Sequence, residues 1–245
     1  MRHIFIQEKF EELGIALSDI SLGDFDSIGE YTAKKKRDQN GELYNSAGAF
    51  FRPNYERGLL IYSLIRKYKL TSYLEIGFGR GYSAICAAKA MHDNGIPGAV
   101  YTVDIKFDQK QMDLIKNIMP SDWLNRIVAV QGDSKEVLKE VFERQPQFDF
   151  VYIDGDHRAD AVKADWELLK DRWTNFCLFD DYHLPTKSET DIECAMVIDS
   201  IDHPSKELII MDRRIFFDDR RISNAEIDYG QVLLTNEPKS TLNEW

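Results

Sequence analysis

The stretch FDFVYIDGDHRADAVKADWELL, residues 148–169, contains the two kinds of element that decide the fold. Its first six residues are almost all apolar, which is typical of a strand covered on both faces. After the polar turn DGDHR, the apolar residues Val162, Trp166 and Leu169 recur at helical spacing, and Trp173 continues the period. The stretch therefore predicts a strand at 148–154 and a helix at 159–173.

The same alternation extends along the chain on both sides of this stretch. Apolar runs that predict strands are SYLEIG (72–77), AVYTVDI (99–105), RIVAVQG (126–132), FDFVYID (148–154) and NFCLFDD (175–181), and helical periods occupy 82–91, 109–118 and 134–142. Strands that alternate with helices form βαβ units, so a parallel sheet with helices on both faces is expected. After a helix at 192–201, the runs ELIIMD, RRIFFDD and YGQVLLT predict an antiparallel edge.

The N-terminal region has a different character. Ile6, Phe10, Leu13 and Leu17 follow a helical period, but the residues up to 51 are polar and glycine-rich, with a KKKR run at 34–37. We predict a cap or lid at 1–52 and one main domain at 53–245. The KKKR run suits either a solvated loop or an electrostatic contact for an anionic group of a substrate.

Composition limits the class of partner. The chain has 245 residues, a net charge of −11 and a pI near 5.0, which disfavours nucleic acid and anionic membranes because both require excess Lys and Arg. Three cysteines without a CxxC pair indicate buried free thiols in a reducing compartment. With neither a signal-like stretch nor a long apolar span, we expect a cytoplasmic protein with a small-molecule substrate, and association into a homo-oligomer is left open.

A glycine-rich loop follows the first of the predicted parallel strands. YLEIGFGRGYSA places Gly77, Gly79 and Gly81 between that strand and the next helix, where backbone can approach a ligand closely. The GxGxG spacing is one residue shorter than the GxGxxG of dinucleotide-binding folds, and the charge of Glu75 disfavours a pyrophosphate and favours a cationic ligand. The next two strands end in Asp104, which can accept from ribose hydroxyls, and in QGDS.

These motifs, LEIGFGRG, VYTVDI and VQGDS, each at a strand end, resemble the class I S-adenosylmethionine-dependent methyltransferases over residues 73–181. The resemblance implies a Rossmann-like, doubly wound α/β fold with seven mostly parallel strands, an antiparallel edge and an N-terminal helical cap. It also implies that the glycine loop carries the methionine part, Asp104 the ribose, and Asp133 and Ser134 the adenine. The expected cofactor-binding residues are Glu75, Gly77, Gly79, Gly81, Ser83, Asp104, Asp133 and Ser134.

Two further strands end in acids and histidines, at IDGDH and FDDYH. In the strand order expected for this fold, Asp154, Asp180 and Asp181 end side by side near the methyl donor. Three carboxylates without basic partners in the local sequence would repel one another, and a divalent cation such as Mg²⁺ would relieve this and leave positions for substrate oxygens. His157 is placed to act as general base, for which an ordinary histidine pKa of about 6.5 is suitable.

The same residues resemble the cation-dependent O-methyltransferases, which include catechol-type and macrolide-sugar enzymes. This resemblance implies Asp154, Asp180 and Asp181 as metal ligands, His157 as base, and a hydroxyl of a sugar or vicinal diol as methyl acceptor. The N-terminal region does not match the substrate-binding region of the macrolide enzymes, so the acceptor is not carried over. Additional candidates are Asp156 as a helix cap, His183 beside the site, and Arg52, Tyr55 and Arg57 as substrate contacts.

Other functions are compatible with parts of the pattern. A metal-free methyltransferase needs the glycine loop but not the acids, although the chain has no NPPY or DPPY motif for exocyclic amines of bases. An aminopropyl transferase would use the acids to bind a polyamine but would give His157 no task. A nicotinamide-dependent oxidoreductase is disfavoured by the glycine spacing, and a catalytically silent binding domain by the acid-rich pocket.

Overall fold

A computed structural model describes residues 1–16, 36–37, 43–44, 55–183, 193–210 and 229–236. The strands are β1 (Arg2–Phe5), β2 (Lys36–Arg37), β3 (Leu43–Tyr44), β4 (Ser72–Ile76), β5 (Ala99–Asp104), β6 (Ile127–Gln131), β7 (Phe148–Ile153), β8 (Trp173–His183), β9 (Lys206–Ile210) and β10 (Tyr229–Thr235). The helices are α1 (Ile6–Glu12), α3 (Tyr55–Tyr68), α4 (Tyr82–Asp93), α5 (Gln109–Ile118), α6 (Ser121–Leu124), α7 (Ser134–Arg144), α8 (Ala159–Leu169) and α9 (Glu193–Ser200).

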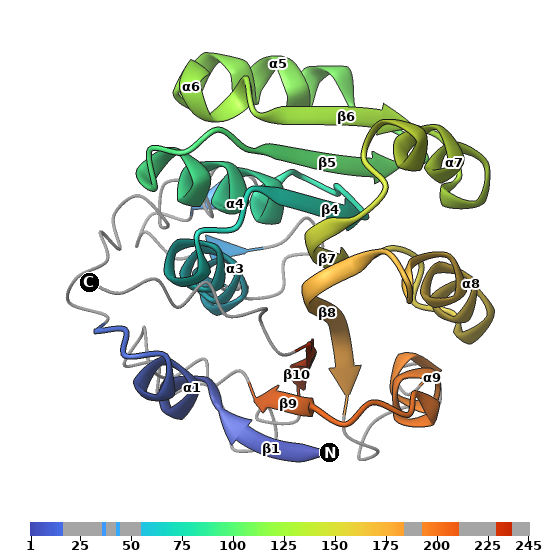
Figure 1. Ribbon diagram of the computed structural model, residues 1–245. Coiled ribbons are helices and arrows are strands. Elements are labelled where there is room, and N and C mark those ends of the chain that lie inside the picture. The colour runs from blue at the N-terminus through green and yellow to red at the C-terminus, as the bar shows by residue number, and fades with distance from the viewer. Residues whose placement is uncertain (17–35, 38–42, 45–54, 184–192, 211–228, 237–245) are drawn as a thin grey trace.

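Eight strands form one twisted sheet in the order β1-β9-β10-β8-β7-β4-β5-β6 (Figure 1). The five strands from β4 to β8 are parallel, and β10 is antiparallel to both of its neighbours. The chain runs from β4 to β5 and β6 on one side and then returns to β7 and β8 on the other. This order creates a switch point between β4 and β7, at whose carboxyl edge ligands bind in open α/β sheets.

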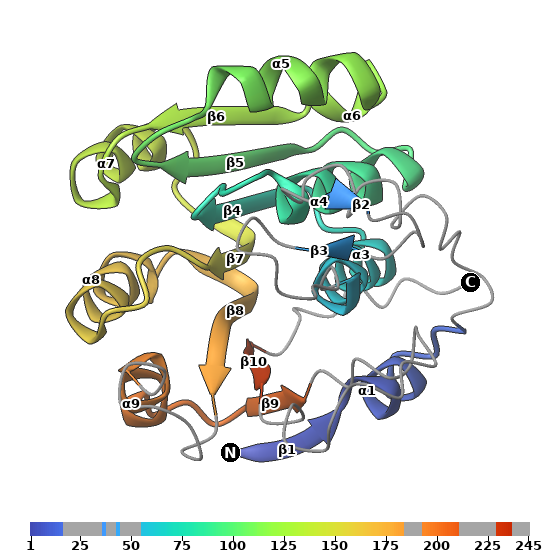
Figure 2. The same ribbon diagram turned by 180° about the vertical axis from the view of Figure 1, so that it is seen from behind.

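Helices cover both faces of the sheet, as Figures 1 and 2 show from opposite sides. One core lies between the sheet and α1, α3 and α4, and includes Tyr73, Phe150 and Phe176 from three neighbouring strands. The rings of Tyr73 and Phe150 lie 5.3 Å apart, and those of Phe150 and Phe176 5.9 Å apart. The other core contains Leu74 and Val151 and packs under α7, α8 and α9. Because side chains alternate along a strand, the wholly apolar strands supply both cores.

The predicted α/β fold is confirmed, with one more strand than expected. The additional strand is β1, which pairs in parallel with β9 inside the region that was predicted as a cap. A four-residue stretch with one buried side chain, Ile4, is too short to show a strand period. The rest of the predicted cap lies largely outside the described residues, so its boundary at 52 stays a prediction. Of the KKKR run, Lys36 and Arg37 form β2, which pairs with β3.

Some predicted boundaries were wrong. The helix that was expected to reach Trp173 ends at Leu169, and Trp173 is instead the first residue of β8. Trp173 therefore continued the helical spacing by coincidence. YGQVLLT is the antiparallel strand β10, whereas β9, from ELIIMD, runs in the same direction as β8. RRIFFDD lies outside the described residues.

The three cysteines, Cys86, Cys177 and Cys194, are buried and unpaired, as predicted. Among the described helices, none is both long enough and apolar enough to cross a membrane.

Candidate active site

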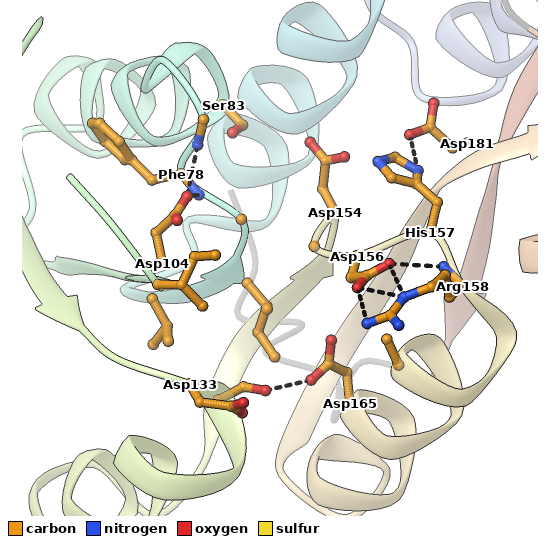
Figure 3. A pocket seen from close by; sticks show the side chains of 18 of the residues that line it. Phe78, Ser83, Asp104, Asp133, Asp154, Asp156, His157, Arg158, Asp165 and Asp181 are labelled. Atoms are coloured by element: carbon orange, nitrogen blue, oxygen red, sulfur yellow. Dashed lines mark hydrogen bonds and ion pairs between the residues drawn. The ribbon is translucent and has the colours of Figure 1, made fainter. Parts of the chain in front are cut away.

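A cavity of about 1000 Å³ opens at the carboxyl edge of the parallel strands, around the switch point. Its walls come from the glycine loop after β4, the ends of β5 and β6, the loop after β7, and one residue of β8 (Figure 3). Of the twelve residues that were predicted for cofactor, metal or catalysis, nine line this cavity, and Glu75, Gly81 and Asp180 do not. The volume suits a nucleoside-sized ligand together with a small second molecule.

The glycine loop has a backbone that side chains would disrupt. Gly77 has φ +95°, and a Cβ atom built there would lie 1.9 Å from the carbonyl oxygen of Asp154. Gly81 has φ +82° and is the N-cap of α4, where a Cβ would meet the Phe78 ring at 2.5 Å. Gly77 therefore allows the loop to pass close to the loop after β7, and Gly81 leaves room for the Phe78 ring. Gly79 faces open space, since nothing lies within 4 Å of its Cβ position.

Asp104 holds the loop in place. Its Oδ2 atom accepts hydrogen bonds from the backbone N–H groups of Phe78 (2.9 Å) and Gly79 (3.1 Å), and Oδ1 accepts from the N–H of Lys106 (3.1 Å). The carboxylate also lines the cavity. Asp104 is thus placed where a ligand in the cavity would meet both the loop and the end of β5, and its contact with a ribose stays a prediction.

Glu75 lies behind the cavity wall and is fully buried. Its carboxylate accepts hydrogen bonds from the hydroxyls of Ser83 (2.7 Å), Thr102 (2.8 Å) and Tyr73 (3.1 Å). Burial raises the pKa of Glu75 to about 7, although the three hydroxyls act in the opposite direction. In this structure Glu75 joins β4, β5 and α4, and a ligand in the cavity would feel its charge without touching it.

Asp133 and Ser134 lie at the start of α7, directly after β6, and both line the cavity. Asp133 is the N-cap, and its Oδ1 accepts from the N–H of Lys135 at 3.0 Å. The Ser134 hydroxyl donates to Oδ1 of Asp165 at 2.6 Å, an interaction drawn in Figure 3. Asp165 comes from α8, is 5% exposed and also lines the cavity. The two predicted adenine contacts therefore already have protein partners.

Of the three predicted metal ligands, Asp154 and Asp181 line the large cavity and Asp180 does not. Asp180 is 4% exposed and accepts hydrogen bonds from the hydroxyl of Tyr152 at 2.8 Å and from the amide of Gln231 at 3.1 Å. The guanidinium of Arg57, on α3, contacts Asp180 and also Asp154, the latter at 2.9 Å. The role of Asp180 as a metal ligand beside Asp181 stays a prediction, and its contact with Arg57 competes with that role.

Asp181 has a distorted backbone and contacts His157. Gly230 pairs with Tyr182 and Val232 with Phe179, so two residues of β8 oppose one of β10 in a β-bulge. Within it Asp181 has φ +52°, a conformation that Asp tolerates better than most residues. Its Oδ2 lies 2.6 Å from Nδ1 of His157. This hydrogen bond is the main reason why the pKa of His157 is raised to about 11.

A neutral His157 therefore requires that the charge of Asp181 be offset. The expectation of an ordinary histidine pKa overlooked Asp181, which is distant in sequence but adjacent in the fold.

Comparison with known proteins connects this geometry to a family. Residues 74–182 match the family model of a methyltransferase domain. No curated protein matches the chain.

Solved structures share the fold of much of the chain. An O-methyltransferase from Bacillus cereus in complex with S-adenosylhomocysteine is 17% identical, with a TM-score of 0.56, covering 90% of this chain and 95% of that one. The O-methyltransferase TomG from Streptomyces achromogenes, involved in tomaymycin synthesis and solved with S-adenosylmethionine, is 17% identical, with a TM-score of 0.52 and coverage of 73% and 79%. A methyltransferase of Podospora anserina bound to S-adenosylhomocysteine is 16% identical, with a TM-score of 0.50 and coverage of 74% and 78%.

One group of side chains in the domain has the composition of a metal site. Asp154, His157 and Asp181 each offer a ligand atom, and these atoms lie within 4.8 Å of one another. Burial and the nearby charge of Asp180 raise the pKa of Asp154 well above its usual range, although the charge of Arg57 acts in the opposite direction. The two carboxylates therefore fit a divalent cation beside His157.

Two residues of the site were not recognised from the sequence in their observed positions. Arg57, predicted as a substrate contact, lines the cavity, and that role stays a prediction. It also pairs with acids that follow it by 97 and 123 residues, and local sequence carries no signal for such contacts. The position of Asp165 could have been predicted from the sequence. It is three residues after Val162 and four before Leu169, and this spacing places its carboxylate on the buried face of α8.

The remaining candidates have different outcomes. Asp156 was expected to cap α8, but the N-cap is Arg158, and Asp156 instead forms an ion pair with the guanidinium of Arg158 at 2.6 Å. The first N–H of α8, at Ala159, donates to Glu193 on α9 at 2.8 Å. The side chains of Tyr55 and His183 and the whole of Arg52 lie outside the described part of the chain.

Proposed function

We propose that the protein transfers a methyl group from S-adenosylmethionine to a hydroxyl group of a small molecule, with a sugar or a vicinal diol as the acceptor. The observation that carries this proposal is the His157–Asp181 pair at the mouth of a cavity that also contains the glycine loop and Asp104. The match to a methyltransferase domain and the cofactors bound by proteins of the same fold support it.

The cofactor would occupy the glycine-loop side of the cavity. Gly79 has open space around its Cβ position, which leaves room for the methionine part of the cofactor. Asp104 lines the same cavity and would accept hydrogen bonds from the ribose hydroxyls. S-adenosylmethionine supplies the methyl group on a positively charged sulfonium. Asp154 stands between Asp104 and the His157–Asp181 pair in Figure 3, so its charge and that of the buried Glu75 favour a cationic group there.

His157 would remove the proton of the acceptor hydroxyl. Its Nδ1 is engaged by Asp181, which fixes the orientation of the ring and leaves Nε2 to accept the proton. Asp181 thereby has the role of the carboxylate in a base dyad: it orients the ring and stabilises the imidazolium that forms.

A divalent cation would be held by Asp154 and Asp181 next to His157, with Asp180 excluded by its contact with Arg57. Bound there, the cation would polarise the acceptor hydroxyl and offset the charge of Asp181.

Calorimetric titration with S-adenosylmethionine, S-adenosylhomocysteine and NAD tests the class of ligand. We expect binding of the first two and not of NAD, and the reverse would favour an oxidoreductase. Methyl transfer to a panel of diols and sugars, followed by mass spectrometry with added Mg²⁺ and with EDTA, tests the acceptor and the cation. Full activity in EDTA would remove the cation from the proposal, and transfer of an aminopropyl group from the decarboxylated cofactor would overturn methyl transfer.

A further inference from the structure

Asp165 presents a buried carboxylate to the cavity at the end that lies away from His157. The residue is 5% exposed, and burial is the main cause of the raised pKa of its side chain. Its Oδ1 accepts from Ser134, whereas Oδ2 has no hydrogen-bond partner among the residues that the structure describes. A Cβ atom built at Gly155 would lie 3.4 Å from Oδ2. The glycine therefore leaves this oxygen uncovered on a wall of the cavity.

The surroundings of Asp165 suit a flat ring. Ile105, the residue after β5, lines the cavity and is 75% exposed, so it offers an apolar surface to a ligand there. The ends of β5 and β6 are joined next to it, since the N–H of Gly132 donates to the carbonyl oxygen of Asp104 at 2.9 Å. Ser134 follows two residues later and leads to Asp165. An apolar surface and a hydrogen-bond acceptor thus belong to one continuous part of the wall.

This combination recognises a planar ring that carries an amino group. An amino group donates to a carboxylate, whereas a carbonyl at the same position of the ring would face a like partial charge and leave Asp165 unpaired. On the proposed function, the planar ring in this cavity is the adenine of the cofactor. We propose that Asp165 accepts a hydrogen bond from the exocyclic amino group of adenine and selects adenine over a 6-oxopurine. Ser134 acts through Asp165 by holding its other oxygen.

The inference rests on the proposed function, and two ligands separate their tests. S-adenosylhomocysteine carries the amino group, and S-inosylhomocysteine, its deaminated form, carries a carbonyl oxygen instead. Calorimetry measures both affinities for the wild type and for Asp165→Asn, Asp165→Ala and Glu167→Ala. Glu167 is a matched control, because it lies on the same helix but is exposed and paired with Lys170.

The wild type should bind S-adenosylhomocysteine about tenfold to a hundredfold more tightly than S-inosylhomocysteine, as expected for one hydrogen bond to a charged group. In Asp165→Asn, the amide oxygen still accepts from Ser134 and the NH₂ group faces the cavity, so the preference should shift toward S-inosylhomocysteine by at least tenfold. Asp165→Ala should bind both ligands with similar affinity, and Glu167→Ala should keep the wild-type ratio.

Wild-type protein that binds neither ligand would overturn the proposed function. Wild-type protein that binds both equally well, or an Asp165→Asn variant that keeps the wild-type ratio, would overturn the role of Asp165 alone. Because each result is a ratio of two affinities in the same protein, a partial loss of folded protein does not imitate the expected shift.

Discussion

We expect Glu75→Gln to change how the free energy of unfolding depends on pH. Glutamine has the same shape as glutamate but cannot ionise. Its amide oxygen can accept from Thr102, and its NH₂ group can donate to the Tyr73 and Ser83 hydroxyls, which accept as readily as they donate. The substitution therefore keeps the hydrogen bonds of the buried cluster and removes the charge.

The pKa of Glu75 gives the expected magnitude. Its folded-state value is about 7, against an ordinary value of 4.5. A carboxyl group with a raised pKa binds its proton more tightly in the folded state, so its contribution to stability is complete below pH 4.5 and is lost as the pH rises to 7. Each pKa unit corresponds to about 1.4 kcal/mol, which makes the loss about 3 kcal/mol. Relative to the wild type, the Gln variant should gain about this much between pH 4.5 and pH 8.

Urea unfolding at several pH values between 4.5 and 8 measures this difference. Glu167→Gln, which changes an exposed glutamate, is the control and should follow the wild-type pH dependence. If the difference between Glu75→Gln and the wild type is constant over this range, then Glu75 does not titrate with a raised pKa, and the argument from burial is wrong.

Three further predictions concern the site. Asp104→Ala should weaken calorimetric binding of S-adenosylhomocysteine by about tenfold to a hundredfold, through loss of charge-assisted hydrogen bonds; affinity within a factor of two would exclude contact with the ribose. His157→Ala should lower the rate of methyl transfer by about 10²- to 10⁴-fold with unchanged S-adenosylhomocysteine affinity, and a small deficit would make it a positioning residue. Asp181→Ala should keep the wild-type midpoint of urea unfolding and lose activity. Asp180→Ala should instead lower the free energy of unfolding by about 3 to 5 kcal/mol, because Arg57 loses a buried partner. If the two variants had the same effects on urea unfolding and on activity, this difference between Asp180 and Asp181 would be wrong.

The parallel core of the fold could be predicted from the sequence because its signals are local. Each of the strands from β4 to β8 is a short apolar run, and each of the helices α4, α5, α7 and α8 shows its own period. The glycine loop was recognisable for the same reason, since Gly77 and Gly81 serve a turn of only a few residues. The strand β1 was missed because its stability comes from pairing with β9, about two hundred residues away along the chain.

The site was predictable only as far as strand ends determine it. The sequence pattern indicates the strand order, and the strand order brings three acids to one cavity: Asp104, Asp154 and Asp181. The bulge that accompanies Asp181 depends on the pairing of β8 with β10, and no residue near position 181 indicates it.

Arg57 gives the three acids unequal roles. It contacts both Asp154 and Asp180, and Asp180 is further satisfied by Tyr152 and Gln231, so the interior end of the cluster is neutralised. Three ionised carboxylates against one guanidinium would leave two negative charges on the side of Asp154 and Asp181, at the cavity, and the raised pKa of Asp154 reflects this excess. A protonated His157 would offset one of them, but a histidine that acts as base must be neutral. We therefore expect the working site to hold a positive charge from outside the chain whenever His157 is ready to accept a proton, and both a divalent cation and a sulfonium meet that requirement.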